Sequence, residues 1–298
     1  MVDPAENGLK RTVVRLGTVA VIIALVGYTA AILRLRATES SLVFVRTGGL
    51  QALPPPTVSL RLPYRTIVIP TEDSLRLGAW IIPAVHADSS GMWVLLCHGQ
   101  TGNIATTTRP QYYADLRTIG VNIIAFDWRG FGTSTGEPSE YGLYRDATAT
   151  YRYLRDSLGV PAHEIIIFGH SLGTAPAIEL ATRVPAAGLI VEGAPTSVRD
   201  RGAELYPWLP VKYVARIDFN SLSRIGNVRM PILFMHARAD ERIPILHARR
   251  LFAAATASKE FVELGGTHSD AFLRDSATYF GEYRKFVDKV RTPRSPTR

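Results

Sequence analysis

The stretch FGHSLGTA, residues 168–175, decides the fold of this chain. Ser171 stands between Gly169 and Gly173, directly after the apolar run EIIIFG and just before the Ala-rich segment APAIELATRV. This pattern predicts a strand that turns sharply into a helix, with a strained serine at the turn and glycines that keep strand and helix from colliding. A helix-capping serine would fit the five residues alone, but the flanking strand and helix patterns favour an exposed nucleophile.

Short apolar runs alternate with segments of helical period through most of the chain. The predicted strands are RTIVIP (65–70), LRLGAWII (75–82), MWVLLC (92–97), VNIIAF (121–126), EIIIFG (164–169), AGLIVEG (187–193), PILFMH (231–236) and KEFVEL (259–264). Continuous apolar strands separated by helices predict an α/β protein with a mostly parallel eight-stranded sheet covered by helices on both faces. The first two runs, joined by TEDS, are expected to pair as a hairpin at the sheet edge.

Residues 16–33 form an apolar segment of 18 residues without a charged side chain. As an α-helix it would be about 27 Å long, just enough to cross the hydrocarbon core of a bilayer. A signal peptide is the main alternative, but Arg34 and Arg36 follow where a small-residue cleavage site would be needed. A buried helix of a soluble protein would show a polar face, and this segment has none. We therefore predict one N-terminal transmembrane helix.

Around this helix the chain divides into further parts. We expect an N-terminal tail at 1–15, a linker at 34–59, an α/β domain at 60–291 and a disordered tail at 292–298. Three consecutive prolines, Pro54 to Pro56, predict a stiff spacer in the linker that holds the domain away from the membrane.

The formal net charge of +8 is unevenly distributed along the chain. Basic residues flank the apolar segment and crowd the C-terminal end, which suits anionic lipid head groups, whereas the interior lacks the basic stripes of a nucleic-acid groove. We expect a membrane partner and no nucleic-acid partner. The flanking charges are Lys10, Arg11 and Arg15 on one side and Arg34, Arg36 and Arg46 on the other. Each side of the apolar segment thus carries three basic residues, so the positive-inside rule does not decide the orientation of the helix. Of the two sides of the membrane, we favour the extracytoplasmic one for the domain.

Ligands of an open parallel sheet bind at the carboxyl ends of the strands, so the residues just after each strand matter most. A serine hydroxyl needs a base to take its proton, and that base is usually a histidine held by a carboxylate. His268 lies in the glycine-containing loop after the last predicted strand, and Asp240 follows the preceding strand. We therefore predict Ser171 as nucleophile, His268 as base and Asp240 as the acid that orients it.

Other histidines and acids compete for these roles. His86 and His163 lie in loops before strands, His247 lies in a helical stretch, His170 should leave the turn in another direction, and His236 is expected to be structural. Glu192 lies one strand too early, and Glu241 is expected to point outward.

An acyl transfer reaction also needs donors for the oxyanion. The backbone N–H of Leu172 is expected to supply one, and the backbone N–H of Gln100, in the loop CHGQTGN, the other. His98 has no partner at metal-ligand spacing, and Cys97 ends an apolar strand and is expected to be structural. We therefore expect no metal and no cofactor.

Two further segments invite a structural interpretation. Asp127 and Arg129 in FDWRGFGTSTG are expected to pair and brace their loop. The insertion between the sixth and seventh strands is short for a lid, and its apolar residues could line an acyl pocket or simply pack in the core. These residues are Tyr206, Trp208, Leu209, Tyr213 and Val214.

The motifs CHGQTGN, FDWRGFGTSTGEPSEYGLYRDA, GHSLGTA, HARADERIP and GGTHSD, in this order, resemble those of the α/β-hydrolase superfamily. Within it they are most similar to membrane-anchored alpha/beta-hydrolase domain-containing proteins related to bud-emergence homologues. The resemblance covers residues 60–290, and departs from many relatives in having Gln100 where they have Asn. It implies a serine hydrolase acting on acyl esters or thioesters, often of lipid-like molecules. A peptidase of the prolyl-oligopeptidase type, which shares the three catalytic residues, and a non-catalytic membrane-tethered binding protein are the alternatives.

Overall fold

The computed structural model describes residues 4–46, 60–85, 91–106 and 108–291. Eight strands form one sheet in the order β1-β2-β4-β3-β5-β6-β7-β8. Their bounds are β1 Arg65–Pro70, β2 Arg76–Ile82, β3 Trp93–Cys97, β4 Asn122–Phe126, β5 Ile165–His170, β6 Gly188–Glu192, β7 Ile232–Ala237 and β8 Lys259–Leu264. The pairs β1–β2 and β2–β4 are antiparallel, and the remaining pairs are parallel. The predicted mostly parallel eight-stranded sheet and its edge hairpin are thus confirmed.

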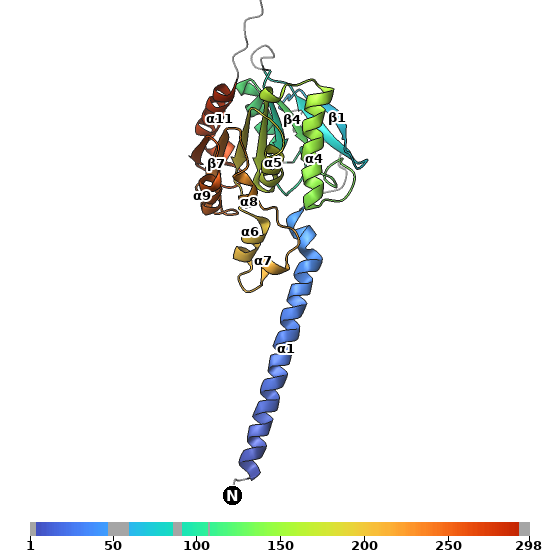
Figure 1. The fold of residues 1–298 in the computed structure, drawn as a ribbon, viewed down its shortest axis with the longest axis vertical. Helices are drawn as coiled ribbons and strands as arrows, with labels where there is room; N and C mark the ends of the chain where they lie inside the picture. The colour runs from blue at the N-terminus through green and yellow to red at the C-terminus, as the bar shows by residue number, and fades with distance from the viewer. Residues whose placement is uncertain (1–3, 47–59, 86–90, 107, 292–298) are drawn as a thin grey trace, which may run out of the picture.

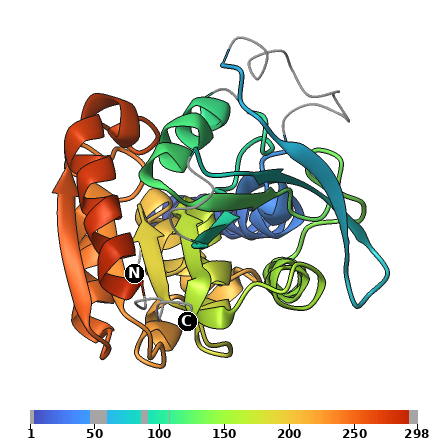
Figure 2. The same ribbon diagram turned by 90° about the horizontal axis from the view of Figure 1, so that it is seen from above.

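Helices cover both faces of the sheet (Figures 1 and 2). Their bounds are α1 Pro4–Val43, α3 Arg109–Leu116, α4 Glu140–Arg152, α5 Thr174–Ala181, α6 Val198–Leu205, α7 Val211–Val214, α8 Leu222–Ile225, α9 Ile245–Ala254, α10 Ala271–Arg274 and α11 Ser276–Val290. The central strands are continuous apolar runs because successive side chains enter two different cores. Ile165 and Ile167 face the helices α4 and α5, and Ile166 and Phe168 face α3 and α11.

The N-terminal helix is longer than the sequence predicted. α1 has 40 residues and extends past both ends of the predicted span 16–33. The first ten residues of the predicted linker are therefore helical, since nothing in LRLRATESSLV breaks a helix and the last turns pack on the domain. Glu39 and Val43 are buried there. The prolines of the predicted spacer lie outside the described residues.

α1 projects from the domain as a single long rod (Figure 1). Residues 11–30 are all exposed, and the helix contains an 18-residue window of mean hydropathy 2.3 with none of it buried. By length and composition this helix could cross a membrane. The insertion between β6 and β7 (residues 194–230), which carries α6 and α7, lies beside the domain end of this rod (Figure 1).

Candidate active site

Ser171 lies at the turn between β5 and α5 with φ of +54°. This left-handed conformation is strained for a residue with a side chain, and it lifts the serine out of the strand direction. The flanking glycines are required by close contacts. A Cβ atom at Gly169 would lie 2.6 Å from the Cα of Thr174, and one at Gly173 would lie 2.2 Å from the carbonyl oxygen of Cys97. The predicted strand, turn and helix are all present.

The structure brings Ser171, His268 and Asp240 together in one chain of hydrogen bonds. The Oγ atom of Ser171 lies 2.8 Å from Nε2 of His268, and Nδ1 of His268 lies 2.7 Å from Oδ2 of Asp240. A carboxylate can only accept, so Nδ1 carries the hydrogen and Nε2 is free to accept from the serine hydroxyl. All three side chains are largely buried, which shields the chain of hydrogen bonds from water.

Asp240 is held as a carboxylate by the groups around it. Its Oδ1 atom accepts hydrogen bonds from the backbone N–H groups of Arg242 at 2.9 Å and Ile243 at 2.7 Å. Burial alone would raise the pKa of Asp240, but the hydrogen bonds from His268 and from Ile243 lower that pKa below its ordinary value. His236 is structural as expected, because its Nε2 donates to the carbonyl of Ile243 at 2.9 Å and so supports the same loop.

Two competing residues lie close to His268 without joining the chain of hydrogen bonds. His170 donates from Nε2 to the backbone carbonyl of His268 at 3.0 Å, and burial is the main cause that lowers the pKa of His170 to about 3. His170 is therefore a neutral support for the loop. Glu241 accepts from the backbone N–H of His268 at 3.3 Å, and its side chain is 59% exposed, so it points outward as expected.

The remaining histidines lie away from Ser171 or outside the described residues. His163 belongs to a short helix before β5, at the amino edge of the sheet. His247 is buried in α9, where its ring contacts the hydroxyl of Thr196 at 2.9 Å and the carboxylate of Glu204 at 3.0 Å. His86 lies outside the described residues.

The predicted oxyanion donors lie on either side of Ser171. Leu172 is the second residue of the short helical turn Ser171–Gly173, and Gln100 lies in the loop after β3. Gly99 lets that loop approach closely, since a Cβ there would lie 3.2 Å from the Cβ of Ser171. Among the described residues, neither the Leu172 nor the Gln100 amide donates to a protein acceptor. Both amides are therefore available to a ligand.

A cavity of about 220 Å³ opens directly at Ser171 and His268. It lies between the sheet and the helices α3, α10 and α11. Its apolar lining comes from Leu96, Tyr112, Tyr113, Phe168 and Phe272, and its polar lining includes Gln100, Arg109, Glu192, Arg242 and Tyr279. A cavity with this lining can bind a ligand that has an apolar chain and a small number of polar groups.

The insertion does not line this cavity. Leu209 belongs instead to a small cluster against which Tyr206 and residues of α1 pack, and Trp208 and Tyr213 are exposed. The expectation that these residues and Val214 could form an acyl pocket is wrong, because the insertion folds toward α1 while the cavity lies under α3 and α11. The alternative of core packing fits Tyr206 and Leu209.

Glu192 lies in the cavity and has a hydrogen-bonded partner that the sequence did not reveal. The hydroxyl of Tyr279 donates to Oε2 of Glu192 at 2.8 Å, and the hydroxyl of Tyr112 lies 3.3 Å from that of Tyr279. Burial is the main cause that raises the pKa of Glu192 to about 7; the hydrogen bond from Tyr279 opposes this shift and the charge of Asp240 adds to it. Tyr112 and Tyr279 stand among core aromatics in the sequence, so no pattern marked them as cavity residues.

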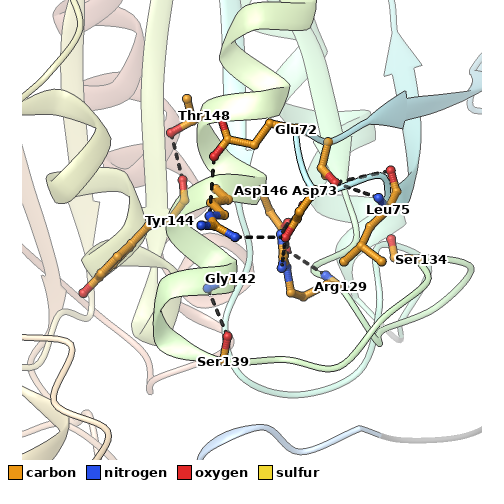
Figure 3. A network of polar contacts seen from close by, with 12 residues as sticks. Glu72, Asp73, Leu75, Arg129, Ser134, Ser139, Gly142, Tyr144, Asp146 and Thr148 are labelled. Carbon is orange, nitrogen blue, oxygen red and sulfur yellow. Dashed lines mark hydrogen bonds and ion pairs between the residues drawn. The ribbon is translucent and has the colours of Figure 1, made fainter.

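The predicted pairing of Asp127 with Arg129 is wrong. Arg129 turns away from the cavity and binds Asp146 of α4, with Nη2 at 2.7 Å, and Asp73 of the β1–β2 turn, with Nη1 at 2.8 Å (Figure 3). Asp127 instead accepts from the backbone N–H of Ile104 at 2.7 Å. Both residues lie in the loop after β4, where the regular alternation of a strand has ended, and each side chain points to a different partner.

The structure shows no arrangement suited to a metal ion in the described part of the chain, where no three His, Cys, Asp or Glu side chains form a ligand group. His98 is buried, with Nδ1 at 2.8 Å from the carbonyl of Gly99 and Nε2 at 3.6 Å from Asp127. Cys97 is buried in β3, and burial raises the pKa of its thiol far above the ordinary value. Both residues therefore have structural roles.

Comparison with known proteins agrees with this fold. Residues 94–295 match the model of the alpha/beta hydrolase family. The uncharacterized protein Rv2307c of Mycobacterium tuberculosis is 34% identical over 91% of this chain and 95% of its own length. The lysophosphatidylserine lipase ABHD12 of Danio rerio is 28% identical over 73% of this chain and 64% of its own length.

Among solved structures, an esterase of Pyrococcus furiosus, Pf2001, superimposes with a TM-score of 0.68 at 20% identity. The match covers 82% of this chain and 96% of the esterase, and it shows the shared fold. With its family-model match over two thirds of its length and a relative of 34% identity along almost all of it, this chain belongs to the alpha/beta hydrolase family.

Proposed function

We propose that this protein is a membrane-anchored serine hydrolase that cleaves acyl esters or thioesters. The observation that carries the proposal is the 2.8 Å contact between Ser171 Oγ and His268 Nε2 at the wall of an aromatic-lined cavity. The family supports a hydrolase, and a relative named as a lysophosphatidylserine lipase supports a lipid-like acyl substrate.

In the proposed reaction, Ser171 Oγ forms a bond to the acyl carbon while His268 Nε2 takes the hydroxyl proton. The N–H groups of Gln100 and Leu172 hold the negative oxygen of the tetrahedral intermediate. His268 then gives its proton to the leaving alcohol or thiol, and the acyl group remains on Ser171. A water molecule repeats the sequence, with His268 as base, and releases the carboxylic acid. Asp240 stabilises the imidazolium in both halves, and no cofactor takes part.

The test is labelling with a fluorophosphonate probe, which reacts with an activated serine. Wild-type protein should be labelled, Ser171→Ala should not be, and Ser269→Ala is the matched control because Ser269 lines the same cavity. A folded wild type that stays unlabelled, or a Ser171→Ala variant that labels normally, would contradict the proposal. Acyl p-nitrophenyl esters, acyl thioesters and aminoacyl anilides then separate esterase, thioesterase and peptidase activity.

We propose anchoring by α1 on two grounds. Residues 11–30 are exposed and mostly apolar, which water tolerates poorly. Ala31 and Ile32, at the end of the apolar segment, pack on the insertion, so cleavage as a signal peptide would remove part of the domain's own packing. Full-length protein should stay in membranes after alkaline carbonate extraction and keep its N-terminus by intact mass. Release by carbonate, or a mass lacking α1, would contradict the anchor.

A further inference from the structure

The end of α1 is fixed to the insertion by an apolar contact. Ala31, Ile32 and Leu35 of α1 lie against a small cluster of buried insertion residues. These residues are Leu209, Val211 and Ala215. The insertion therefore reaches the last apolar residues of the helix rather than only its polar end.

Polar contacts hold the same two elements together one turn further along. Nε of Arg36 donates to the carbonyl of Val214 at 3.0 Å. The buried carboxylate of Glu39 accepts from the backbone N–H groups of Arg216 and Ile217, both at 2.8 Å. Because these contacts use backbone groups of the insertion, they fix its position relative to the helix axis.

This attachment places the insertion at the membrane surface. Ala31 and Ile32 lie within the apolar segment 16–33, so an element packed against them lies at the level where that segment leaves the bilayer. Figure 1 shows α6 and α7 at this level, beside the rod and outside the body of the domain.

The surface of the insertion at this level is apolar and exposed. The side chains are Leu205 at 55% exposure, Trp208 at 60% and Tyr213 at 88%. Tryptophan and tyrosine favour the head-group layer, because it receives their rings and also hydrates their polar atoms. Arg216, exposed and three residues after Tyr213, adds positive charge that anionic lipids attract, whereas Lys212 is paired with Asp200 at 3.1 Å.

The catalytic end of the sheet faces the same way. Immediately after α1, the N–H of Val45 donates to the carbonyl of Gln100 at 3.0 Å, and the N–H of Gly102 donates to the carbonyl of Val45 at 3.2 Å. The loop that carries a proposed oxyanion donor is thus bonded directly to the end of the membrane helix. α6 also follows the carboxyl end of β6, so Ser171 and α6 lie at the same edge of the sheet.

We propose that Leu205, Trp208 and Tyr213 form a membrane-contacting patch that rests in the head-group layer beside α1. The patch turns the catalytic edge of the domain toward the bilayer, so the substrate is an acyl lipid that resides in the membrane. This proposal rests on the proposed anchoring and hydrolase activity.

Tryptophan fluorescence of the full chain in lipid vesicles tests the patch. Trp80 and Trp128 are buried, and Trp93 is half-buried at the amino end of β3, so the signal lost in Trp208→Phe reports on Trp208. In vesicles of phosphatidylcholine and phosphatidylglycerol, this component should be quenched by bromine on the lipid chains and protected from iodide in water.

The outcomes separate the patch from the anchor. If the protein resists carbonate extraction but the Trp208 component is quenched by iodide and unaffected by brominated lipid, the patch proposal is overturned and the anchor stands. If carbonate releases the protein, the anchor fails and the patch proposal fails with it.

Activity provides the second test. The double variant Trp208→Ser with Tyr213→Ser should lose roughly tenfold in kcat/KM on a lysophospholipid in vesicles, and should keep wild-type activity on a water-soluble p-nitrophenyl ester. Val68→Ser is the matched control, because it removes a 57% exposed apolar side chain from β1, away from α6 and α7 (Figure 1). Equal activity of wild type and double variant on the vesicle substrate would overturn the proposal. Loss on both substrates alike would also overturn it, and inactivity of the wild type on both would count against the proposed function.

Discussion

Asp240 fixes the tautomer of His268, because its carboxylate accepts the Nδ1 hydrogen at 2.7 Å. In Asp240→Asn the amide can donate to Nδ1, which moves the ring hydrogen to Nε2 and removes the acceptor for the Ser171 proton. We expect kcat on a p-nitrophenyl ester to fall about 10⁴-fold with an unchanged circular dichroism spectrum. Glu241→Gln is the control and should stay near wild type. A loss in Glu241→Gln as large as that in Asp240→Asn would instead assign the acid role to Glu241.

The raised pKa of Glu192 predicts a pH-dependent stability. Its pKa is about 7 in the folded protein against an ordinary value of 4.5, so the folded state keeps the proton in a range where the unfolded chain releases it. The contribution of Glu192 to the unfolding free energy is therefore fully present below about pH 4.5 and is lost as the pH rises through about 7. The total loss is about 3 kcal/mol. Glu192→Gln cannot ionise and should not show this loss.

Urea unfolding of both proteins in detergent micelles measures this effect. The unfolding free energy of the wild type minus that of Glu192→Gln should decrease between about pH 4.5 and pH 7 and then level off. A difference that does not change with pH would show that the buried carboxyl ionises normally.

At the scale of elements, the Arg129 network ties the loop after β4 to α4 and to the β1–β2 turn (Figure 3). Arg129 and Asp146 are both buried, and Arg129→Met would leave Asp146 without its charged partner. We expect the unfolding free energy to fall by about 3–5 kcal/mol. The hydrogen bond from Arg129 also holds the pKa of Asp73 far below its usual range, an effect that the variant removes.

Arg145→Met is the matched control for this prediction. Arg145 pairs with Asp73 at 3.3 Å, but its side chain is 41% exposed. An exposed pair is worth about 0–1 kcal/mol, so denaturant unfolding should show only a small change. Similar losses in the two variants would mean that burial of Asp146 is not what makes Arg129 important.

At the scale of the whole molecule, Glu39 couples α1 to the domain. Glu39→Ala removes the acceptor for the N–H groups of Arg216 and Ile217. Hydrogen exchange measured by mass spectrometry should become faster in the insertion and stay unchanged in β5. Glu39→Gln keeps one acceptor oxygen and should show a smaller effect. Unchanged exchange in Glu39→Ala would show that apolar packing alone holds α1 in place.

Much of the fold follows from local patterns in the sequence. The apolar runs predicted each of the eight strands, most clearly the central ones, because a strand buried on both faces needs apolar residues at nearly every position. The turn at Ser171 was predictable from two glycines and their flanking segments, and the order Ser171, Asp240, His268 placed all three at one edge of the sheet. Their catalytic roles remain predictions.

Only the tertiary structure decided which distant segments meet. Arg129 pairs with Asp146 and Asp73 rather than its neighbour Asp127, Tyr279 meets Glu192 in the cavity, and Glu39 caps backbone groups of the insertion. The sequence by itself determined the sheet and the sharp turn at Ser171, because both are encoded in adjacent residues. The cavity wall and the packing of α1 on the domain depend on side chains far apart in the chain. Their contacts exist only after the sheet has formed and the helices have packed on it.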